Sequence, residues 1–511
     1  MRNISINIKK YIPFFLGAAL LVSCEQDSIS GPEPAAALPS LSAGSLNLSK
    51  YVSLGNSLTA GYTDGALFKA SQQMSMPSML AGKFAMAGGG SFSQPLMNDN
   101  NGGLLLAGNM IAGPRLFFNG AGPASLLTAN PAALPTTDIA ANNPTGPFNN
   151  MGVPGAKSFH LLAPGYGNIG NVALGLANPY FVRMASAPNA SVLADAMAQS
   201  PTFFSLWIGN DDALGYATSG GDGSNPLTPI SGAPGQGFDG TYGALVATLT
   251  AGGAKGVVAN IPYVTSLPHF TTVPHNPVPL DAATAAAVNG AYAAYNGGLQ
   301  AAYGALQATG LFSAEELAKR QISFSAGAGN AVVIVDESLT DLGAINPAFA
   351  ALPKYRQATA ADLLVLPASA FIGTLAVPGN PLTVNGVAVP LADKWVLTPE
   401  EQAEIKTAID SYNGIIKGAA DAAGLAYFDA NSYLQQLAAG GIRDGKYTVT
   451  SSLVTGGVFS LDGVHPNARG YALLSNLMMK TLDVTFGSNF EASGNMLDIG
   501  DYPTNYSPAM Q

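Results

Sequence analysis

Three side chains in this sequence have the types and the surroundings that serine chemistry needs. Ser57 follows the apolar run 51–54 at a break marked by Gly55, which is typical of a buried strand that ends in a tight turn. Asp462 and His465 stand three residues apart, just before the last expected helix. A serine hydroxyl is a poor nucleophile unless a base takes its proton, and histidine needs a carboxylate to fix its tautomer. A D-x-x-H turn can carry both of these groups.

Two further turns offer donors for the negative charge that develops on a carbonyl oxygen during nucleophilic attack. Gly155 closes a short strand within 149–158, and Asn210 follows the continuous apolar run that begins at Thr202. The backbone N–H groups of Ser57 and Gly155 and the side-chain amide of Asn210 would supply three donors. We therefore expect an oxyanion hole made of Ser57, Gly155 and Asn210.

The elements that must position these turns alternate between strands and helices. Apolar runs bounded by turn residues predict strands at 51–54, 149–158, 202–212, 255–262, 330–338 and 424–430. Helices are expected at 281–308, from Thr398 onwards, and from about Asn467 to Leu482. This alternation predicts a parallel sheet covered on both faces. The fold class is therefore α/β, with one three-layer α/β/α domain whose active groups follow the carboxyl ends of the strands.

One helix has a particularly clear start and buried face. Thr398 is a capping residue, Pro399 occupies the first helical position, and Glu401 stands three residues after the cap. Apolar residues then recur at helical spacing, namely Ile405, Ala408, Ile409, Tyr412 and Ile416. We expect this stripe to face the core.

Taken in order, the four turns resemble the sequence blocks of the SGNH, or GDSL, family of serine esterases and lipases. The blocks here are GNSL at 55–58, VPGA at 153–156, GNDD at 209–212 and DGVHP at 462–466. The resemblance implies a mostly parallel, flavodoxin-like sheet, no metal and no cofactor. It also implies hydrolysis of esters or thioesters through an acyl-enzyme, with Ser57, Asp462 and His465 as the catalytic residues.

The chain departs from the family's usual pattern in two respects. Asn56 stands where the first block usually has aspartate, although that aspartate is not a member of the triad. Gly155 comes 98 positions after Ser57, which is long for the family. The additional residues must therefore be accommodated outside the sheet.

Composition excludes some partners. Only 10% of the 511 residues are charged, well below the roughly 25% of an average soluble domain. The formal net charge is −10, which argues against nucleic acid because phosphate binding needs a basic surface. The chain contains 60 Gly and 35 Pro, which predicts long loops.

The N-terminus has the pattern of a secretory signal peptide at 1–23. Arg2, Lys9 and Lys10 form a basic segment, and the apolar stretch 11–23 follows it. That stretch is too short to span a bilayer, which takes about 20 residues.

The sequence LVSC at 21–24 resembles a bacterial lipobox, and Cys24 is the single cysteine of the chain. The resemblance implies cleavage before Cys24 and lipidation of its thiol, so that acyl chains hold the protein at a membrane. Residues 24–48 would then be a flexible tether. We expect a lipoprotein of the cell envelope, at the outer membrane and facing the periplasm or the surface. The alternative is an ordinary signal peptide with a cysteine there by chance.

The remaining chain divides into a hydrolase domain at 49–486 and a C-terminal tail at 487–511. Large insertions are expected near 63–148 and 340–396, where periodicity is weak and Gly, Asn and Pro are frequent. The apolar, Met-rich part at 74–117 could be a lid over an acyl pocket or simple packing.

Three functions remain open on these observations. The first is a lipid-anchored serine esterase or lipase that hydrolyses a small-molecule or lipid ester through acyl-Ser57. The second is an acyltransferase that uses the same acyl-serine. The third is a catalytically idle surface lipoprotein that binds glycan or lipid. In each case we expect a monomer without nucleic acid as partner.

Overall fold

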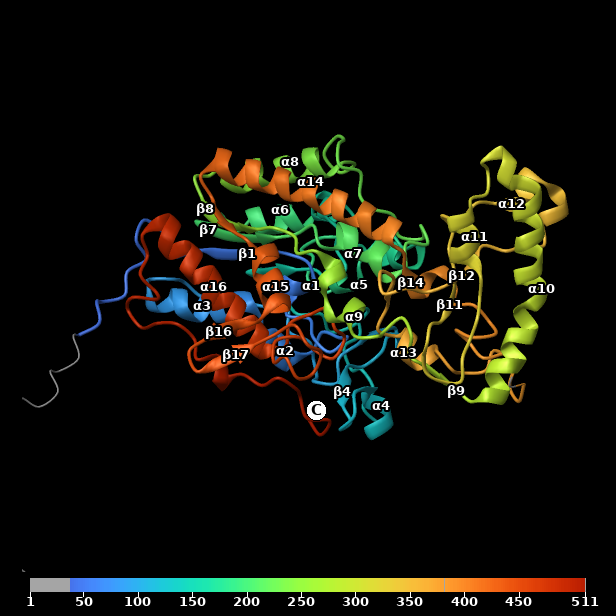
Figure 1. The fold of residues 1–511 in the computed structure, drawn as a ribbon. Coiled ribbons are helices and arrows are strands. Elements are labelled where there is room, and N and C mark those ends of the chain that lie inside the picture. The colour runs from blue at the N-terminus through green and yellow to red at the C-terminus, as the bar shows by residue number, and fades with distance from the viewer. Residues whose placement is uncertain (1–36, 381, 511) are drawn as a thin grey trace, which may run out of the picture. The chain divides into compact units, whose positions relative to one another are not determined.

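A five-stranded parallel sheet lies at the centre of the structure, a computed structural model that describes residues 37–380 and 382–510 (Figure 1). Its strands along the chain are β1 (Tyr51–Gly55), β6 (Asn150–Gly152), β7 (Phe203–Trp207), β8 (Lys255–Ala259) and β15 (Ala426–Phe428). Their order across the sheet is β6-β1-β7-β8-β15, and every neighbouring pair is parallel. Numbered along the chain, this order is 2-1-3-4-5, which is flavodoxin-like. The predicted α/β class with a parallel sheet is confirmed.

The strands β1 and β7 are buried along their whole length, as strands between two helical layers must be. The Tyr51 hydroxyl lies 2.8 Å from the Ser205 Oγ, so two polar groups inside the sheet satisfy each other. The register places Gly55 opposite Trp207 on one side and opposite Gly152 on the other. Because the strands are parallel, the three turns that follow these residues emerge at the same edge of the sheet.

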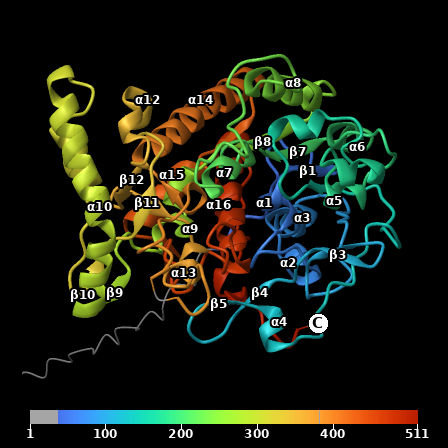
Figure 2. The same cartoon turned by 90° about the vertical axis from the view of Figure 1, so that its right-hand side faces the viewer.

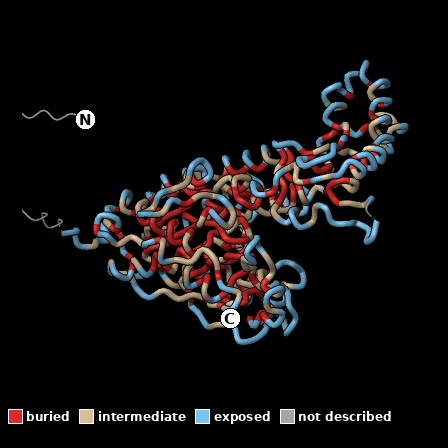
Figure 3. Tube along the Cα trace, turned by 60° about the horizontal axis from the view of Figure 1, so that its bottom comes forward, coloured by how far each residue is buried: buried red, intermediate tan, exposed pale blue. Residues whose placement is uncertain are grey.

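Helices cover both faces of the sheet and complete the three layers. α8 (Phe238–Thr250) packs against α14 (Pro399–Ala423) on one face, and α3 (Met76–Met86) packs against α16 (Ala468–Phe486) on the other (Figures 1 and 2). Buried residues gather between these layers (Figure 3). Shorter elements between β6 and β7 are η1 (Ser158–Leu162), η2 (Ile169–Leu174), α5 (Pro179–Val182) and α6 (Val192–Met197).

The helix expected from Thr398 is α14, and its start is the predicted capping box. The Thr398 hydroxyl accepts a hydrogen bond from the Glu401 N–H, and the Glu401 carboxylate accepts one from the Thr398 N–H. All five residues of the predicted stripe are buried, namely Ile405, Ala408, Ile409, Tyr412 and Ile416.

The first expected insertion contains the helix that connects β1 to β6. Residues 63–148 form α2 (Lys69–Gln73), α3 and α4 (Leu126–Ala129), with the hairpins β2–β3 (Leu104–Leu106, Asn109–Ala112) and β4–β5 (Leu116–Phe118, Pro123–Ser125). Met76, Met79, Leu80 and Phe84 of α3 are buried in the main core. Met76 and Met79 are therefore packing, whereas Met86 at the end of the helix is exposed.

The connection from β8 to α14 forms a lobe beside the sheet, seen at the right of Figure 1. Its elements are η3 (Val264–Ser266), α9 (Pro268–Thr271), β9 (Val278–Leu280), α10 (Ala282–Leu306), η4 (Gln307–Thr309), α11 (Ala314–Arg320), β10 (Gly327–Asn330), β11 (Val333–Val335), α12 (Leu342–Ile345), η5 (Pro347–Phe349), β12 (Tyr355–Gln357), β13 (Leu363–Leu364), α13 (Ala368–Phe371), η6 (Asp393–Trp395) and β14 (Val396–Leu397). The strand expected at 330–338 is β11, but it pairs with β12 instead of joining the central sheet. The buried Arg356 of β12 binds Asp336 and Asp362, which ties this hairpin together.

The described ends of the chain pack against the domain. Leu48, in the last part of the expected tether, is buried, and the Ser45 N–H donates to the Phe486 carbonyl at the end of α16. In the tail, Phe490 is buried and the Tyr506 ring meets the Phe68 ring edge-on. The remaining elements are α15 (Ala430–Ala439), the hairpin β16–β17 (Ile442–Asp444, Tyr447–Val449) and η7 (Ile499–Asp501).

The expected signal peptide at 1–23 and the expected lipidation site Cys24 lie outside the described residues. Among the residues that are described, no helix combines the length and the apolar composition needed to cross a membrane.

Candidate active site

Ser57 stands at the first position of a short helix, α1 (Ser57–Ala60), directly after β1. The chain can turn there because Gly55 has no side chain: a Cβ at this position would lie 2.3 Å from the Trp207 carbonyl oxygen. Asn56 caps the helix, since its Oδ1 accepts a hydrogen bond from the Leu58 N–H at 3.1 Å. Ser57 is only 5% exposed and so is held at the sheet edge with little access to water.

His465 connects Ser57 to Asp462 through its two ring nitrogens. Its Nε2 lies 2.9 Å from the Ser57 Oγ, and its Nδ1 lies 2.9 Å from the Asp462 Oδ2. Burial alone would raise the pKa of Asp462, but the charge and hydrogen bonds of His465 outweigh it and hold that pKa well below its usual range. An ionised carboxylate only accepts, so the Nδ1–H donates to it and Nε2 is left to accept the Ser57 hydroxyl proton.

The turn that carries Asp462 and His465 is fixed by the Asp462 carboxylate itself. Its Oδ1 accepts from the N–H groups of Val464 at 2.8 Å and His465 at 2.9 Å, and its Oδ2 accepts from Gly65 at 2.9 Å. The Tyr62 ring packs against the imidazole, with ring centroids 4.7 Å apart. Carboxylate and imidazole are thus held in one geometry before any substrate arrives.

The expected oxyanion donors follow three adjacent strands. Ser57 follows β1, Gly155 comes after β6 in a turn with φ of 77°, and Asn210 comes directly before α7 (Asp211–Thr218), after β7. Asn210 is 6% exposed, and its Nδ2 finds no hydrogen-bond partner among the described residues. A buried amide donor without a partner is costly, so an acceptor at this place would be well bound.

The sequence blocks assigned no role to Asn56 or to Asp211, yet the two side chains meet. The Asn56 Nδ2 donates to the Asp211 Oδ2 at 2.5 Å. Burial raises the pKa of Asp211 to about 6, while the Asn56 hydrogen bond and His465 act in the opposite direction. The position of Asn56 next to Ser57 was the available signal.

Two more residues position the loop that carries Asp462, and neither was singled out from the sequence. The His269 Nδ1–H donates to the Asp462 carbonyl oxygen at 3.2 Å, and the His269 backbone N–H donates to the Gly463 carbonyl at 2.9 Å. The buried Asp64 accepts from the Leu461 N–H at 3.0 Å, and burial raises the pKa of Asp64 to about 7. Asp64 has φ of 52°, which is uncommon outside glycine and marks a strained turn.

An apolar cavity of about 90 Å³ opens beside Ser57 and His465. Its walls come from α7, the segments after β7 and β8, and the helices α15 and α16. Most of its lining is aliphatic, including Leu434, Leu437, Leu473, Leu474 and Leu477. None of the residues 74–117 lines it, so a lid role for that segment has no support here.

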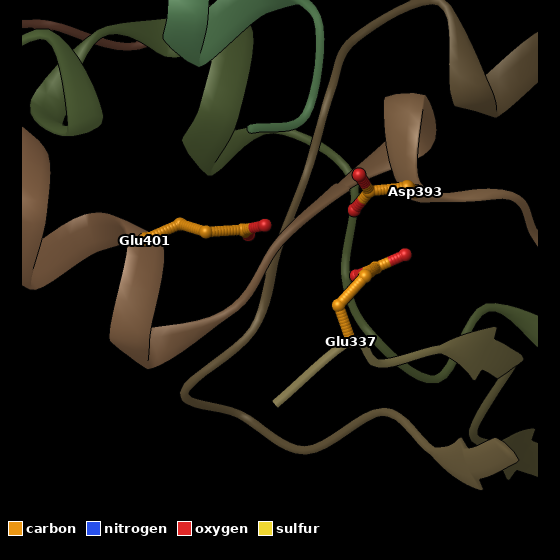
Figure 4. A group of neighbouring side chains, drawn as sticks. All are labelled: Glu337, Asp393 and Glu401. Atoms are coloured by element: carbon orange, nitrogen blue, oxygen red, sulfur yellow. The ribbon is translucent and has the colours of Figure 1, made fainter. Parts of the chain in front are cut away.

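A group of carboxylates elsewhere in the described chain is close enough to share a cation. Glu337, Asp393 and Glu401 point toward one another, with ligand atoms within 4.8 Å (Figure 4). Burial and the neighbouring charges raise the pKa of Asp393 to about 8 and that of Glu401 to about 7. None of the three lines the cavity beside Ser57, so they take no part in its chemistry.

Comparison with known proteins adds little. No protein-family model and no curated protein matches the chain. Among solved structures, the chain is similar to an extracellular lipase from Streptomyces rimosus at 12% identity, with a TM-score of 0.27, over 86% of this chain and 99% of that one. A TM-score this low carries no argument.

Proposed function

We propose that the protein is a serine hydrolase of the SGNH type that cleaves carboxylic esters through an acyl-serine intermediate. One observation carries the proposal: Ser57, His465 and Asp462 form a continuous chain of hydrogen bonds at the carboxyl edge of a parallel sheet. A nucleophile within reach of a base, and a base held by a third group, are the arrangement that activates a hydroxyl.

The reaction would begin with transfer of the Ser57 proton to His465 Nε2 as Oγ attacks the ester carbonyl. Asp462 remains ionised and stabilises the imidazolium that forms, because its pKa is held low. His465 then gives the proton to the departing alcohol, which leaves the acyl group on Ser57. A water molecule, deprotonated by His465, releases the acid and restores the hydroxyl.

The tetrahedral intermediate carries a negative oxygen that must be stabilised where it forms. The backbone N–H groups of Ser57 and Gly155 and the Asn210 Nδ2 would bind that oxygen. The unpartnered amide of Asn210 supports this assignment, because no bond within the described protein has to break before it can donate.

Location and anchoring are proposed from the sequence alone. The signal peptide and lipobox pattern support a mature protein that lies outside the cytoplasm and is held to a membrane by lipidated Cys24. The substrate would be an ester available in the cell envelope or at its surface.

Labelling with a fluorophosphonate probe and hydrolysis of p-nitrophenyl acetate test the proposal together. Wild type should react with both, and Ser57→Ala should lose both while remaining folded. The matched control is Ser53→Ala, which removes a buried hydroxyl from β1, the strand before Ser57, and should leave labelling and turnover intact. Substantial turnover in Ser57→Ala would contradict the proposal, and a wild type that never labels would favour an idle binding protein. Products formed with an added alcohol acceptor separate hydrolysis from acyl transfer.

A further inference from the structure

We infer that the cavity between α15 and α16 holds the acyl chain of the substrate, and that it selects unbranched hydrocarbon chains of about eight to ten carbons. The inference rests on the proposed ester hydrolysis at Ser57 and names the substrate class for it. It concerns which esters the site prefers, so it can fail while the proposed function stands.

The lining of the cavity suits a neutral hydrocarbon. No Asp, Glu, Lys or Arg lines it among the described residues, and its polar side chains are Asn56, Ser57, Asn210, Tyr433 and His465. Four of these five belong to the catalytic turns, so the polar groups gather at one end. A charged or strongly hydrated acyl group would lose its water in the rest of the cavity without finding partners.

Two helices give the cavity its direction. β15 is parallel to β1, so α15 begins at the edge of the sheet where Ser57 lies, and α16 begins there too because it follows His465. The cavity-lining residues of α16 include Gly470, Leu473 and Leu477. Those of α15 include Ala430, Leu434 and Leu437. Both sets have helical spacing, so one face of each helix lines the cavity, which runs away from Ser57.

The spacing of these lining residues sets the length of the hydrocarbon chain that the cavity can hold. Seven residues of helix advance by about 10 Å. An extended hydrocarbon chain advances by about 1.3 Å per carbon at ordinary bond lengths and angles, so roughly eight carbons fit alongside these residues. Leu437 and Leu477 are 9% and 7% exposed, which places the far end of the cavity inside the protein.

The order of bond making and breaking assigns the cavity to the acyl chain rather than the alcohol. When the C–O bond of the ester breaks, the alcohol takes the proton from His465 and must leave before water can attack acyl-Ser57. A group held at depth between two helices cannot leave first. The acyl chain stays bonded to the Ser57 Oγ throughout this exchange, so it is the part that can remain in the cavity.

The test is kcat/KM of the full chain on p-nitrophenyl alkanoates from acetate to palmitate, each kept below its aggregation limit. We expect kcat/KM to rise by about fourfold per added methylene up to about eight to ten carbons and then to level off or fall. A second series of alkyl acetates varies the alcohol alone and should show little dependence on length. A profile that is flat or falls from acetate onwards overturns the inference, as does a length dependence carried by the alcohol.

Substitutions at the far end should move the preferred length in opposite directions. Leu477→Ala should extend it by two or more carbons, and Leu437→Phe should shorten it. Leu482→Ala removes a fully buried leucine of α16 that does not line the cavity, so it should keep the wild-type profile. If both cavity variants fold and keep the wild-type optimum, the assignment is wrong.

A binding measurement separates this inference from the proposed function. Trp207 lines the cavity and Trp395 does not, so in a Trp395→Phe background the remaining tryptophan reports on occupancy. Decanoate should change its fluorescence, and Leu437→Phe should weaken that binding. Binding of decanoate without turnover of any ester would overturn the proposed function and leave the cavity a hydrocarbon site. Turnover of esters without decanoate binding and without length preference would overturn the cavity assignment alone.

Discussion

The side-chain amide of Asn56 donates a hydrogen bond to the carboxylate of Asp211, and this bond joins the turn after β1 to the turn after β7. The SGNH family, which this sequence resembles, usually has an aspartate at this position, and aspartate has no amide N–H to donate. Asn56 thus has two contacts, one to the helix that starts at Ser57 and one to the start of α7, which follows Asn210. The proposed nucleophile and one proposed oxyanion donor are thus tied together by a residue outside the proposed triad.

Asn56→Ala should destabilise the fold in a pH-dependent way. The Asn56 bond opposes the burial that raises the pKa of Asp211 to about 6, so its loss raises that pKa further. The charged carboxylate is then left without this partner, and the free energy of unfolding should fall by about 1–3 kcal/mol above about pH 6. Well below pH 6, where Asp211 is protonated in the folded state of both wild type and variant, that part of the loss should vanish. Urea unfolding at several pH values measures this.

Asp211→Asn is the control for that pH dependence. In an Asp211→Asn background no carboxylate remains at this place, so adding Asn56→Ala should cost a similar amount at pH 5 and pH 8. A pH-dependent loss that survives in the double variant would show that Asp211 is not its origin.

Asn210→Ala should slow ester turnover by roughly 10²–10³-fold while leaving fluorophosphonate labelling detectable. Because the Nδ2 has no partner among the described residues, its removal breaks no bond there, and thermal stability should change little. Kinetics and a melting curve on the same preparation check both statements. Unchanged kinetics would show that Asn210 serves only as the residue before α7. A large loss of thermal stability would show that its side-chain amide has a structural role.

His269→Gln should lower kcat more than it raises KM. His269 contacts the backbone of Asp462 and Gly463 without touching Ser57 or the cavity, so it acts by holding the turn. A small displacement of the base should cost about tenfold or more in kcat. His160→Gln is the matched control, because that histidine stacks on Tyr166 and accepts from the Lys157 N–H away from the turn. Equal effects of the two substitutions would show that His269 does not position the turn that carries Asp462.

The carboxylates Asp393 and Glu401 should make stability fall as pH rises. Burial and neighbouring charge raise their pKa values to about 8 and about 7, so the folded state binds more protons than the unfolded one above about pH 4. Their contribution is fully present below that pH and is lost as pH rises to about 8. Asp393→Asn should therefore raise the free energy of unfolding by about 1–3 kcal/mol at pH 8 and by little at pH 4.

Unfolding of wild type and Asp393→Asn at pH 4 to 8 measures that difference, in EDTA so that no cation neutralises the cluster. Glu400→Gln, on the exposed side of the same helix start, should show no such pH dependence. A stability difference for Asp393→Asn that is constant across this range would contradict the prediction.

Cys24→Ser should move the protein from the membrane fraction to the soluble fraction and abolish metabolic labelling with palmitate. Esterase activity per molecule should not change, because the described domain, with Ser57 and His465, begins well after this residue. Ser23→Ala alters the neighbouring residue without removing the thiol and should remain membrane-bound. Retention of the Cys24→Ser variant at the membrane would count against a lipid anchor.

Local signals in the sequence were enough to locate most of the sheet and the main helices. The capping pattern at Thr398 and the apolar spacing from Ile405 to Ile416 correspond to α14 and its buried face. Caps and helical periodicity depend on residues within a few positions of one another, so a single sequence displays them. The pairing of strands depends on residues that are far apart in the sequence. The segment that predicts the strand β11 therefore does not identify its partner β12.

The candidate site shows the same difference between features that are local in the sequence and features that are not. Asp462 and His465 lie on one turn, and the block pattern predicted the contact of His465 with Ser57, 408 positions away in the sequence. His269 is 193 positions from Asp462 and belongs to no pattern, so nothing local indicated their bond. The apolar cavity is a product of how α15 and α16 pack, and its leucines look like ordinary core residues in the sequence.

The lobe between β8 and α14 lies within the longer connection that joins β8 to β15, two strands that the sheet holds side by side. β8 and β15 are neighbours in the sheet, and the Asn260 N–H donates to the Phe428 carbonyl just beyond their pairing. The entropy of closing a flexible loop grows only with the logarithm of its length, so each doubling costs about 0.6 kcal/mol. The stability of the sheet therefore depends little on the length of this connection. Descendants of this protein could enlarge, trim or exchange the part of the lobe after α9 at little thermodynamic cost. The turns that carry Ser57 and Asn210 would stay at the ends of their strands, and His269 of α9 would still hold the turn that carries Asp462 and His465.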